Sequence, residues 1–360
     1  MNFPYCEKEL QYLSDRDKNM AIAVKMLGKI ERKTDPDLFS ALIQNIVGQQ
    51  ISNKAFETVW QRFKDYFNEL TPKRINAEPL ENIQKLGVSQ KKAAYIKNIA
   101  AKVAAKELDF EILSALSDED ATAELMKLDG VGKWTAEMLL LFSMMRKNVF
   151  SYGDFAIRRG LQILHNHKEI TKPIFEKYRK LYSPYCSAAS FYLWEIGNSN
   201  LKKFPSFLET GDVFAAYASP IGKIILASDK KNLTGLFFGN ISVKESDSPI
   251  FDETKAYLDA YFANKPLPSP PKIKFRGTDF QKKVWNELKK IPYGSVTTYK
   301  ELAKSLNTSP RSVGGAVGKN PVALIVPCHR VIGANDAMTG YAWGIDIKEK
   351  LLKIEQKNGL

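Results

Sequence analysis

Six residues at positions 327–332, Pro-Cys-His-Arg-Val-Ile, constrain this chain more than any other feature. They place Cys328, one of 3 cysteines, directly beside His329, one of 3 histidines. A thiol attacks as its thiolate, and a neighbouring imidazole is a common means of lowering its pKa. The pair therefore predicts a nucleophilic thiol. A buried cysteine with an incidental neighbour is the alternative.

Two short helices joined by a tight turn are predicted just upstream of this thiol. Thr298 and Glu301 have the spacing of a capping box, and Ser309 with Pro310 supplies an N-cap and a first-turn proline for a helix starting at Arg311. This second helix contains the small residues Gly314, Gly315, Ala316 and Gly318. Each glycine costs about 1 kcal/mol of helix propensity, which predicts that another backbone approaches closely. Because the chain carries a net charge of +13, we expect a DNA strand there. Tight packing inside the protein is the alternative.

With these segments, the region from about residue 217 to residue 360 resembles the O6-alkylguanine-DNA alkyltransferases. Further matching segments are residues 217–222, 291–294, 318–321, 340–341 and 348–355. The resemblance implies a protein that transfers an alkyl group to its own cysteine and reacts once. One departure is the sequence Ala342-Trp343-Gly344, where the family has two glycines after a small residue. Trp343 would narrow the pocket or stack outside it, so the range of alkyl groups stays open.

The resemblance also assigns chemical roles to five side chains. Cys328 would attack the alkyl carbon, and His329 would take the thiol proton through a water while Glu355 orients the imidazole. Tyr299 would donate a proton or hydrogen bond to the leaving guanine. Asn320 would hold the active-site turn.

The same resemblance implies a DNA-facing set of residues. Arg311 would fill the base stack after the damaged base rotates out through the minor groove. Ser312, Gly314 and Gly315 would lie against the DNA backbone, and Tyr341 would shape the lid of the pocket.

The first two hundred residues carry a different pattern. Residues 128–136 read Leu-Asp-Gly-Val-Gly-Lys-Trp-Thr-Ala, so Gly130 and Gly132 precede an apolar helix. Glycines at a helix N-terminus let backbone N–H groups face a DNA phosphate, although an ordinary helix-entry turn is the alternative. Asp154 follows and precedes another helix. Taken alone, it is an N-cap.

In combination, these features resemble the helix-hairpin-helix DNA glycosylase superfamily from about residue 36 to residue 200. Residues 42–52, 87–96 and 188–194 match as well. Three scattered cysteines cannot hold an iron-sulfur cluster, and Trp134 occupies the position of the lysine in glycosylase-lyases. Lys133, one residue away, would point about 100° around a helix. The form resembles the monofunctional 3-methyladenine glycosylase II branch.

This second resemblance assigns the excision roles. Asp154 would stabilise the positive sugar and direct water to it, and Trp134 with Trp194 would line the pocket. An indole face attracts a cationic base by roughly 0.5–2 kcal/mol, while core packing is the alternative for either tryptophan. Gln49 would probe the gap in the duplex, and Gly130 and Gly132 would bind phosphate. Asp129 replaces the usual proline and Met138 an aromatic residue, which leaves the fine substrate range open.

The predicted fold is multidomain. Residues 1–208 form an all-α helix-hairpin-helix glycosylase domain. Residues 209–270 form an α/β subdomain, with strands expected at 223–227 and 233–238, and a proline-rich connector follows at 265–271. Residues 271–360 form the α-helical helix-turn-helix subdomain.

The remaining expectations concern partners and location. We expect a monomer that binds double-stranded DNA with alkylated bases, needs no cofactor or metal and contacts no membrane, since no apolar run approaches 18 residues. No leader is evident, and a required thiolate implies a reducing compartment, either cytoplasmic and nucleoid-associated or nuclear. Two other functions stay open. A DNA-binding regulator would use Cys328 as a sensing thiol and perform no chemistry, whereas a cysteine hydrolase would turn over.

Overall fold

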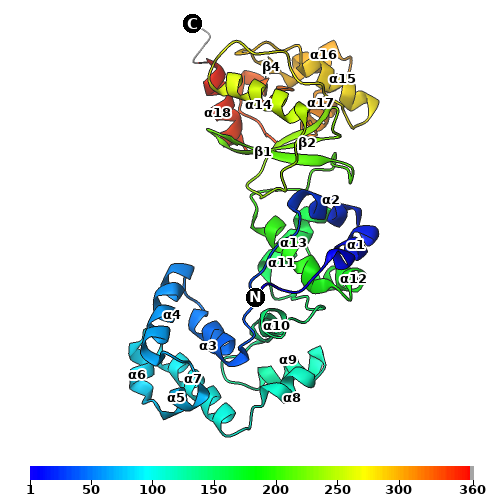
Figure 1. Ribbon diagram of the computed structural model, residues 1–360. Helices are drawn as coiled ribbons and strands as arrows, with labels where there is room; N and C mark the ends of the chain where they lie inside the picture. The colour runs from blue at the N-terminus through cyan, green and yellow to red at the C-terminus, as the bar shows by residue number, and fades with distance from the viewer. Residues whose placement is uncertain (357–360) are drawn as a thin grey trace. The chain divides into compact units, whose positions relative to one another are not determined.

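The computed structural model describes residues 1–356, which are mainly helical (Figure 1). The first helices are α1 (Glu7–Arg16), α2 (Lys18–Leu27), α3 (Leu38–Gly48), α4 (Asn53–Phe67), α5 (Pro72–Ala77), α6 (Leu80–Lys85), α7 (Gln90–Ala104), α8 (Phe110–Ala115), α9 (Asp118–Met126), α10 (Lys133–Phe142), α11 (Phe155–His165), α12 (Lys172–Tyr182) and α13 (Cys186–Asn198). No helix in this described range is long and apolar enough to cross a membrane.

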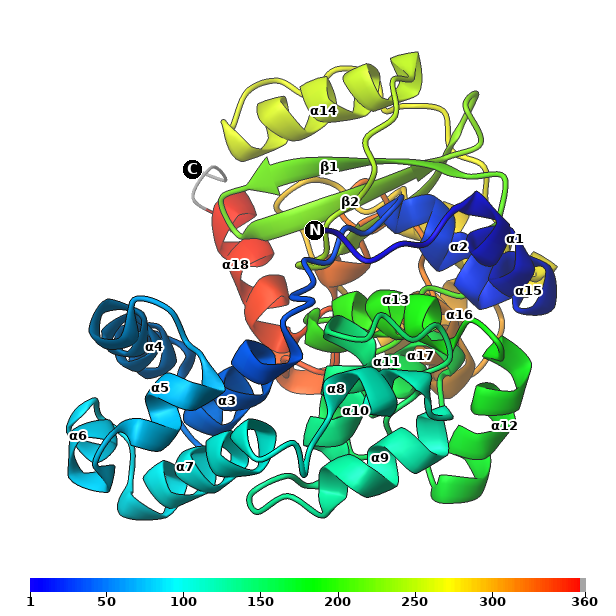
Figure 2. The same cartoon turned by 60° about the horizontal axis from the view of Figure 1, so that its bottom comes forward.

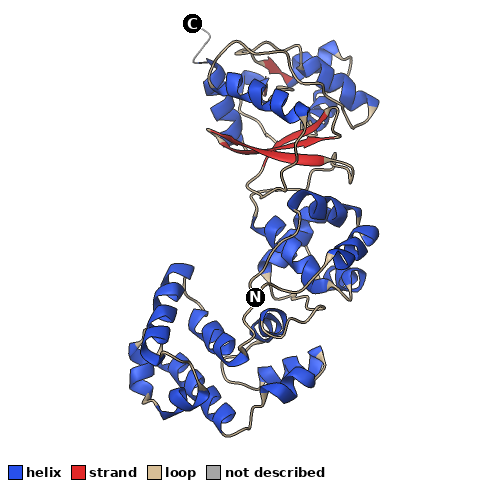
Figure 3. Cartoon of the chain, in the orientation of Figure 1, coloured by secondary structure: helices blue, strands red, loops and turns tan. Residues whose placement is uncertain are grey.

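The second half of the chain contains the strands (Figure 3). Its elements are β1 (Val213–Ser219), β2 (Gly222–Ser228), β3 (Leu233–Phe238), α14 (Pro249–Phe262), α15 (Asp279–Leu288), β4 (Thr297–Thr298), α16 (Tyr299–Ser305), α17 (Pro310–Val317), the 3₁₀ turn η1 (Cys328–Arg330), β5 (Val331–Ile332), the 3₁₀ turn η2 (Ala334–Asp336) and α18 (Ile345–Gln356).

Two compact units divide the chain. One unit comprises Met1–Leu13, Ile30–Arg158 and Thr171–Phe191, and the other comprises Ser14–Lys29, Arg159–Ile170 and the chain from Tyr192 onward. The predicted domain boundaries near residues 208 and 270 stay predictions.

The first unit has the predicted helix-hairpin-helix. α9 and α10 flank the hairpin, and α10 is anchored by the buried run from Met138 to Leu141. Ser52 and Ser89 cap α4 and α7 by accepting from backbone N–H groups, which fixes where each helix begins. Helices α4 to α7 lie together as one cluster (Figure 2).

The second unit is built on a three-stranded antiparallel sheet in the order β1-β2-β3. α14 packs against the sheet, and a continuous apolar core joins the sheet to α14, α15, α17 and α18. The two strands expected from the sequence are confirmed, whereas β1, next to them, was not foreseen. Thr298 and Glu301 form both bonds of the predicted capping box, and Ser309 caps α17, which begins at Pro310.

A second, two-stranded sheet positions the reactive segment. β4 pairs in parallel with β5, with Thr297 opposite Val331 and Thr298 opposite Ile332. Because β4 leads directly into α16 and β5 follows η1, this pairing places the start of α16 beside the turn that carries Cys328.

Candidate active sites

The thiol of Cys328 is buried and held by an asparagine. The Asn320 Nδ2 group donates to the backbone oxygen of Val326 at 2.8 Å and to the Cys328 Sγ at 3.0 Å, while its Oδ1 accepts from the Val322 N–H at 3.1 Å. All three bonds close the loop between α17 and η1. Asn320 therefore lies where it can hold the active-site turn, as the sequence predicts.

His329 and Glu355 form the second part of this site. The His329 Nε2 lies 2.8 Å from the Glu355 Oε1, and both side chains are fully buried. Burial opposes ionisation of Glu355, but hydrogen bonds from His329 and Arg330 outweigh it and lower the pKa of this carboxyl to about 2. Since an ionised carboxylate only accepts, Nε2 donates to it and Nδ1 keeps its lone pair. That Nδ1 is buried and has no hydrogen-bond partner among the described residues.

The two titratable groups start in their neutral forms. Burial raises the pKa of the Cys328 thiol, although the Asn320 hydrogen bond opposes this shift. Burial also lowers the pKa of His329, against the opposing effect of Glu355. Each shift disfavours the charged form, so a proton acceptor is needed when the sulfur attacks.

Two tyrosines lie around the thiol. The Tyr341 hydroxyl oxygen is buried without a well-formed hydrogen bond, and burial together with the nearby Cys328 raises its pKa well above its usual value. Burial raises the pKa of Tyr299 too, with a smaller contribution from Cys328. Trp343 stacks on Phe237 of β3, with ring centroids 5.8 Å apart. Of the two sequence alternatives for Trp343, this contact favours stacking on the sheet.

Sequence reasoning missed three side chains here. Arg330 donates to both carboxylate oxygens of Glu355 at 2.9 Å, and Tyr261 donates to the Oε1 at 2.7 Å. Lys348 is fully buried and donates to the backbone oxygens of Val331 and Thr339. Its spacing of seven residues from Glu355 on α18 was a usable signal, because both residues share the face that carries Leu351 and Leu352.

The second helix of the helix-turn-helix exposes Gly315 and Gly318, whereas Ala316 is buried in the core. Arg311 is exposed in the first turn of α17, and the Ser312 N–H donates to its N-cap, Ser309. A side chain at Gly315 would meet nothing within 4 Å, and one at Gly314 would make only ordinary contact with Tyr299 at 3.8 Å. Tight internal packing therefore does not explain the glycine at position 315. Of the two explanations that the sequence offers, this favours the approach of an external backbone.

The second candidate site joins Trp134 to Asp154. The indole Nε1 donates to the Asp154 Oδ2 at 3.0 Å, while the Oδ1 accepts from the Ile157 N–H at 2.9 Å. Asp154 is thus both the N-cap of α11 and a partner of the tryptophan. Trp134 is 45% exposed, which excludes simple core packing.

The hairpin glycines differ from each other. Gly130 has a φ of +82°, and a Cβ there would lie 2.4 Å from the Tyr95 ring. Gly132 has open space around it and precedes α10 with no side-chain cap. Gly130 is needed to form the turn, whereas Gly132 leaves the N-terminus of α10 accessible to an anion.

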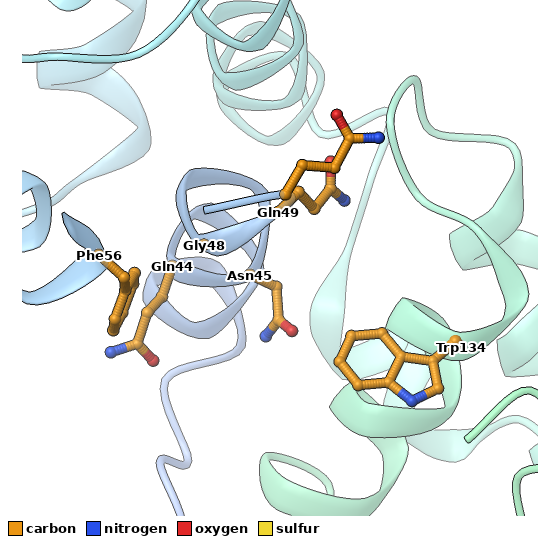
Figure 4. A pocket seen from close by; sticks show the side chains of 7 residues that line it. Gln44, Asn45, Gly48, Gln49, Phe56 and Trp134 are labelled. Atoms are coloured by element: carbon orange, nitrogen blue, oxygen red, sulfur yellow. The ribbon is translucent and has the colours of Figure 1, made fainter. Parts of the chain in front are cut away.

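A pocket of about 540 Å³ opens in front of Trp134 (Figure 4). Its lining residues are Gln44, Asn45, Gly48, Gln49, Gln50, Phe56 and Trp134. The Gln49 Nε2 donates to the Gly130 oxygen at 2.8 Å, and Lys92 donates to the backbone oxygens of Val47 and Gln49. The turn after α3 is therefore held from two sides. Gln50 is exposed there with a φ of +57°.

The remaining residues that the sequence singled out in the glycosylase part lie in different surroundings. Trp194 lies partly buried on α13, in the other compact unit. Met138 is buried in the core, and Asp129 accepts from Asn98 at 3.5 Å. Lys133 is exposed, 3.9 Å from Glu137.

Glu137 was not foreseen. It accepts from the Ser151 hydroxyl at 2.5 Å, and burial raises its pKa, with Asp154 adding to the rise. This bond anchors the loop that leads into Asp154. Within residues 1–356, no group of three or more histidine, cysteine or acidic side chains could hold a metal ion.

Three family models match the chain in order. The model of the HhH-GPD superfamily base excision DNA repair protein matches residues 43–184. Two models of 6-O-methylguanine DNA methyltransferase follow, the ribonuclease-like domain at residues 213–273 and the DNA binding domain at residues 279–357.

Individual proteins are similar to the same two parts of the chain. A methylated-DNA–protein-cysteine methyltransferase of Methanosarcina acetivorans is 48% identical over 151 residues, which are 39% of this chain and 97% of the relative. One from Sulfolobus acidocaldarius is 39% identical over 41% of this chain and 94% of the relative. The structure of a DNA-3-methyladenine glycosidase from Bacillus halodurans is 28% identical over 55% of this chain and 93% of that chain, with a TM-score of 0.51.

A buried thiol lies with an imidazole and a carboxylate in the part of the chain that contains the helix-turn-helix, and the hairpin carries a tryptophan bonded to an aspartate. The chain belongs to the methylated-DNA–protein-cysteine methyltransferase family through its C-terminal part. It is a fusion, because its N-terminal part is a helix-hairpin-helix glycosylase domain.

Proposed function

We propose that this protein repairs alkylated DNA by two reactions. It transfers the alkyl group of O6-alkylguanine to Cys328 and excises purines alkylated on a ring nitrogen, of the 3-methyladenine type, by hydrolysis. The observation that carries the proposal is the buried array in which Asn320 contacts the sulfur and Glu355 orients His329. A docking-only regulator has no use for such an array.

The transfer is a single displacement. The Cys328 sulfur attacks the alkyl carbon, the new S–C bond forms as the C–O6 bond breaks, and the electron pair leaves with the guanine oxygen. The Nδ1 of His329 receives the thiol proton through a water, and Glu355 stabilises the imidazolium that forms. Tyr299 donates to the leaving guanine. Because no group cleaves the thioether, each molecule reacts once.

The excision uses charge instead of a nucleophilic side chain. The flipped cationic base packs on the exposed indole of Trp134, and the pocket role of Trp194 stays a prediction from the sequence. The C1′–N bond breaks with its electron pair going to the base, which leaves neutral and needs no added proton. Asp154 stabilises the positive sugar and accepts the proton of the water that adds to C1′.

DNA binding accompanies both reactions. Gly130 and Gly132 offer backbone N–H groups to a phosphate, and Gln49 lies at the turn that would probe the duplex. Arg311 would enter the base stack beside the flipped guanine, with Ser312, Gly314 and Gly315 against the backbone and Tyr341 over the pocket. We propose a monomer acting on double-stranded DNA, in the reducing compartment that holds the DNA.

The test uses two duplexes, one with 3-methyladenine and one with O6-methylguanine, each incubated with the whole chain. We expect release of free 3-methyladenine with turnover, and label transfer to protein that stops at one alkyl group per molecule. Excision should leave an uncut abasic strand, so borohydride should trap no adduct through Lys133. Binding without either product would favour the regulator, and continued turnover of the transfer would favour a cysteine hydrolase.

A further inference from the structure

The pocket in front of Trp134 has a polar wall that the excision mechanism does not use. Asn45 and Gln44 of α3 both line this pocket, and Figure 4 shows Asn45 on the side of Trp134 and Gln44 beside Phe56. Phe56 completes the α3 side, since its ring lies over Gly48 and a Cβ there would meet it at 3.3 Å. Of the two amides, the one of Asn45 therefore faces the indole of Trp134.

The orientation of the Asn45 amide is fixed. Its Nδ2 donates to the backbone oxygen of Ala41 at 2.8 Å. A carbonyl oxygen only accepts, so the NH₂ group must be the end that faces its own helix. The Oδ1 is then the atom turned away from Ala41, and Figure 4 shows it on the side of Trp134. The pocket thus presents a carbonyl acceptor opposite an indole face.

We propose that the Oδ1 of Asn45 accepts a hydrogen bond from the exocyclic amine of a flipped alkylated adenine and selects 6-amino over 6-oxo purines. This inference rests on the proposed excision function. A cationic purine has a more polarised amine, which strengthens the bond to a carbonyl oxygen. A 6-oxo purine would instead bring its own oxygen against Oδ1 and leave both acceptors unpaired.

Gln44 provides an internal comparison. It lines the same pocket and carries the same amide, but no described hydrogen bond fixes which end faces the pocket. A freely turning amide presents its NH₂ group to an oxo purine or its oxygen to an amino purine. Gln44 therefore serves as the matched control, since its amide lies beside Phe56 and away from Trp134.

The experiment uses DNA treated with tritiated dimethyl sulfate and measures the release of 3-methyladenine and 3-methylguanine from one sample by chromatography. Both bases carry the methyl group at the same atom and both are cationic, so their ratio isolates the remaining substituents. Asn45→Leu should lower the adenine-to-guanine ratio roughly five- to tenfold, the effect of one lost hydrogen bond. Asn45→Asp, which keeps an acceptor, and Gln44→Leu should hold the ratio within about twofold.

The possible outcomes distinguish failure of this inference from failure of the excision function. An unchanged ratio in Asn45→Leu, or equal loss of both bases in Asn45→Leu and Asn45→Asp, would overturn the inference and leave excision itself standing. Release of neither base by the unaltered chain would instead overturn the excision function on which the inference rests. Alkyl transfer to Cys328 in each variant reports that the chain has folded.

Discussion

The two candidate sites of this chain differ in how far their central side chains are exposed to solvent. The thiol of Cys328 is buried, and Glu355 beside it accepts from His329, Arg330, Tyr261 and the Gly294 N–H. Trp134, in the proposed excision site, is instead 45% exposed at a pocket of about 540 Å³. A covalent acceptor used once needs its proton acceptor placed in advance. A site that turns over must admit a base and release it.

The largest expected effect follows from the irreplaceable thiol. Cys328→Ala should abolish alkyl transfer and leave excision within about twofold, because sites that share no contacting residues behave additively. Label transfer from O6-methylguanine duplex and release of 3-methyladenine measure the two activities. The matched control is Cys6→Ala, since Cys6 is an exposed free thiol. Residual label on the Cys328→Ala protein would mean that another nucleophile accepts the group.

Asp154→Asn should act on the other site alone. The amide keeps an oxygen that accepts from the Ile157 N–H, so α11 stays capped, while the lost charge should slow excision by roughly 10²–10³-fold. Single-turnover excision and binding to an abasic duplex measure the two effects separately. Asp129→Asn removes a nearby hairpin carboxylate and should change neither. Equal losses of binding and excision in Asp154→Asn would reduce that carboxylate to a helix cap.

The buried carboxylate of the thiol site should make stability depend on pH. The folded pKa of Glu355 is about 2, below its ordinary 4.5. Its contribution, about 3 kcal/mol from that shift, is fully present above pH 4.5 and is lost as the pH falls toward 2. Urea unfolding at pH 7, 5, 4 and 3 should show the deficit of Glu355→Gln shrinking as the pH falls. A deficit that stays constant across this range would assign the effect to packing.

Arg311→Ala should distinguish a role in flipping the base out of the duplex from a role in the alkyl transfer itself. Unstacking a base costs a few kcal/mol, and an arginine that fills the gap offsets part of this free energy. Without Arg311, repair of duplex DNA should therefore slow roughly tenfold. Transfer from free O6-alkylguanine, which has no stack to fill, should be unaffected. Lys304→Ala on α16 controls for the loss of one positive charge. If both substrates slowed alike, Arg311 would belong to the chemistry or the fold.

The contacts in the two sites also show which interactions can be predicted from the sequence. Capping at Thr298 and Ser309 was predictable because the bonded groups lie three residues apart. The partners that the sequence concealed bond across the fold. Tyr261 reaches Glu355 over 94 residues, and Gln49 reaches Gly130 over 81 residues.

Residue type alone does not reveal burial either. The ammonium of Lys348 is buried where two backbone oxygens accept from it. β1 overlaps residues 217–222, a segment that carries a family motif and no clear strand pattern. Family motifs predicted the reactive residues, and only the structure shows which groups contact them.

The smallest expected effect concerns two glycines with open space around them, Gly315 at one site and Gly132 at the other, and it distinguishes DNA contact from packing. A methyl group at Gly315 would meet nothing within 4 Å, so Gly315→Ala should leave the fold intact and raise its stability by about 0.5–1 kcal/mol through helix propensity. If a DNA backbone lies against that face, the same methyl should weaken duplex repair several-fold without changing transfer from free O6-alkylguanine. Gly132→Ala, also in open space, should weaken excision and not transfer. Thermal unfolding and duplex titration at fixed salt measure both effects. A Gly315→Ala protein that is less stable, or that repairs duplex at the unaltered rate, would return that glycine to an internal role.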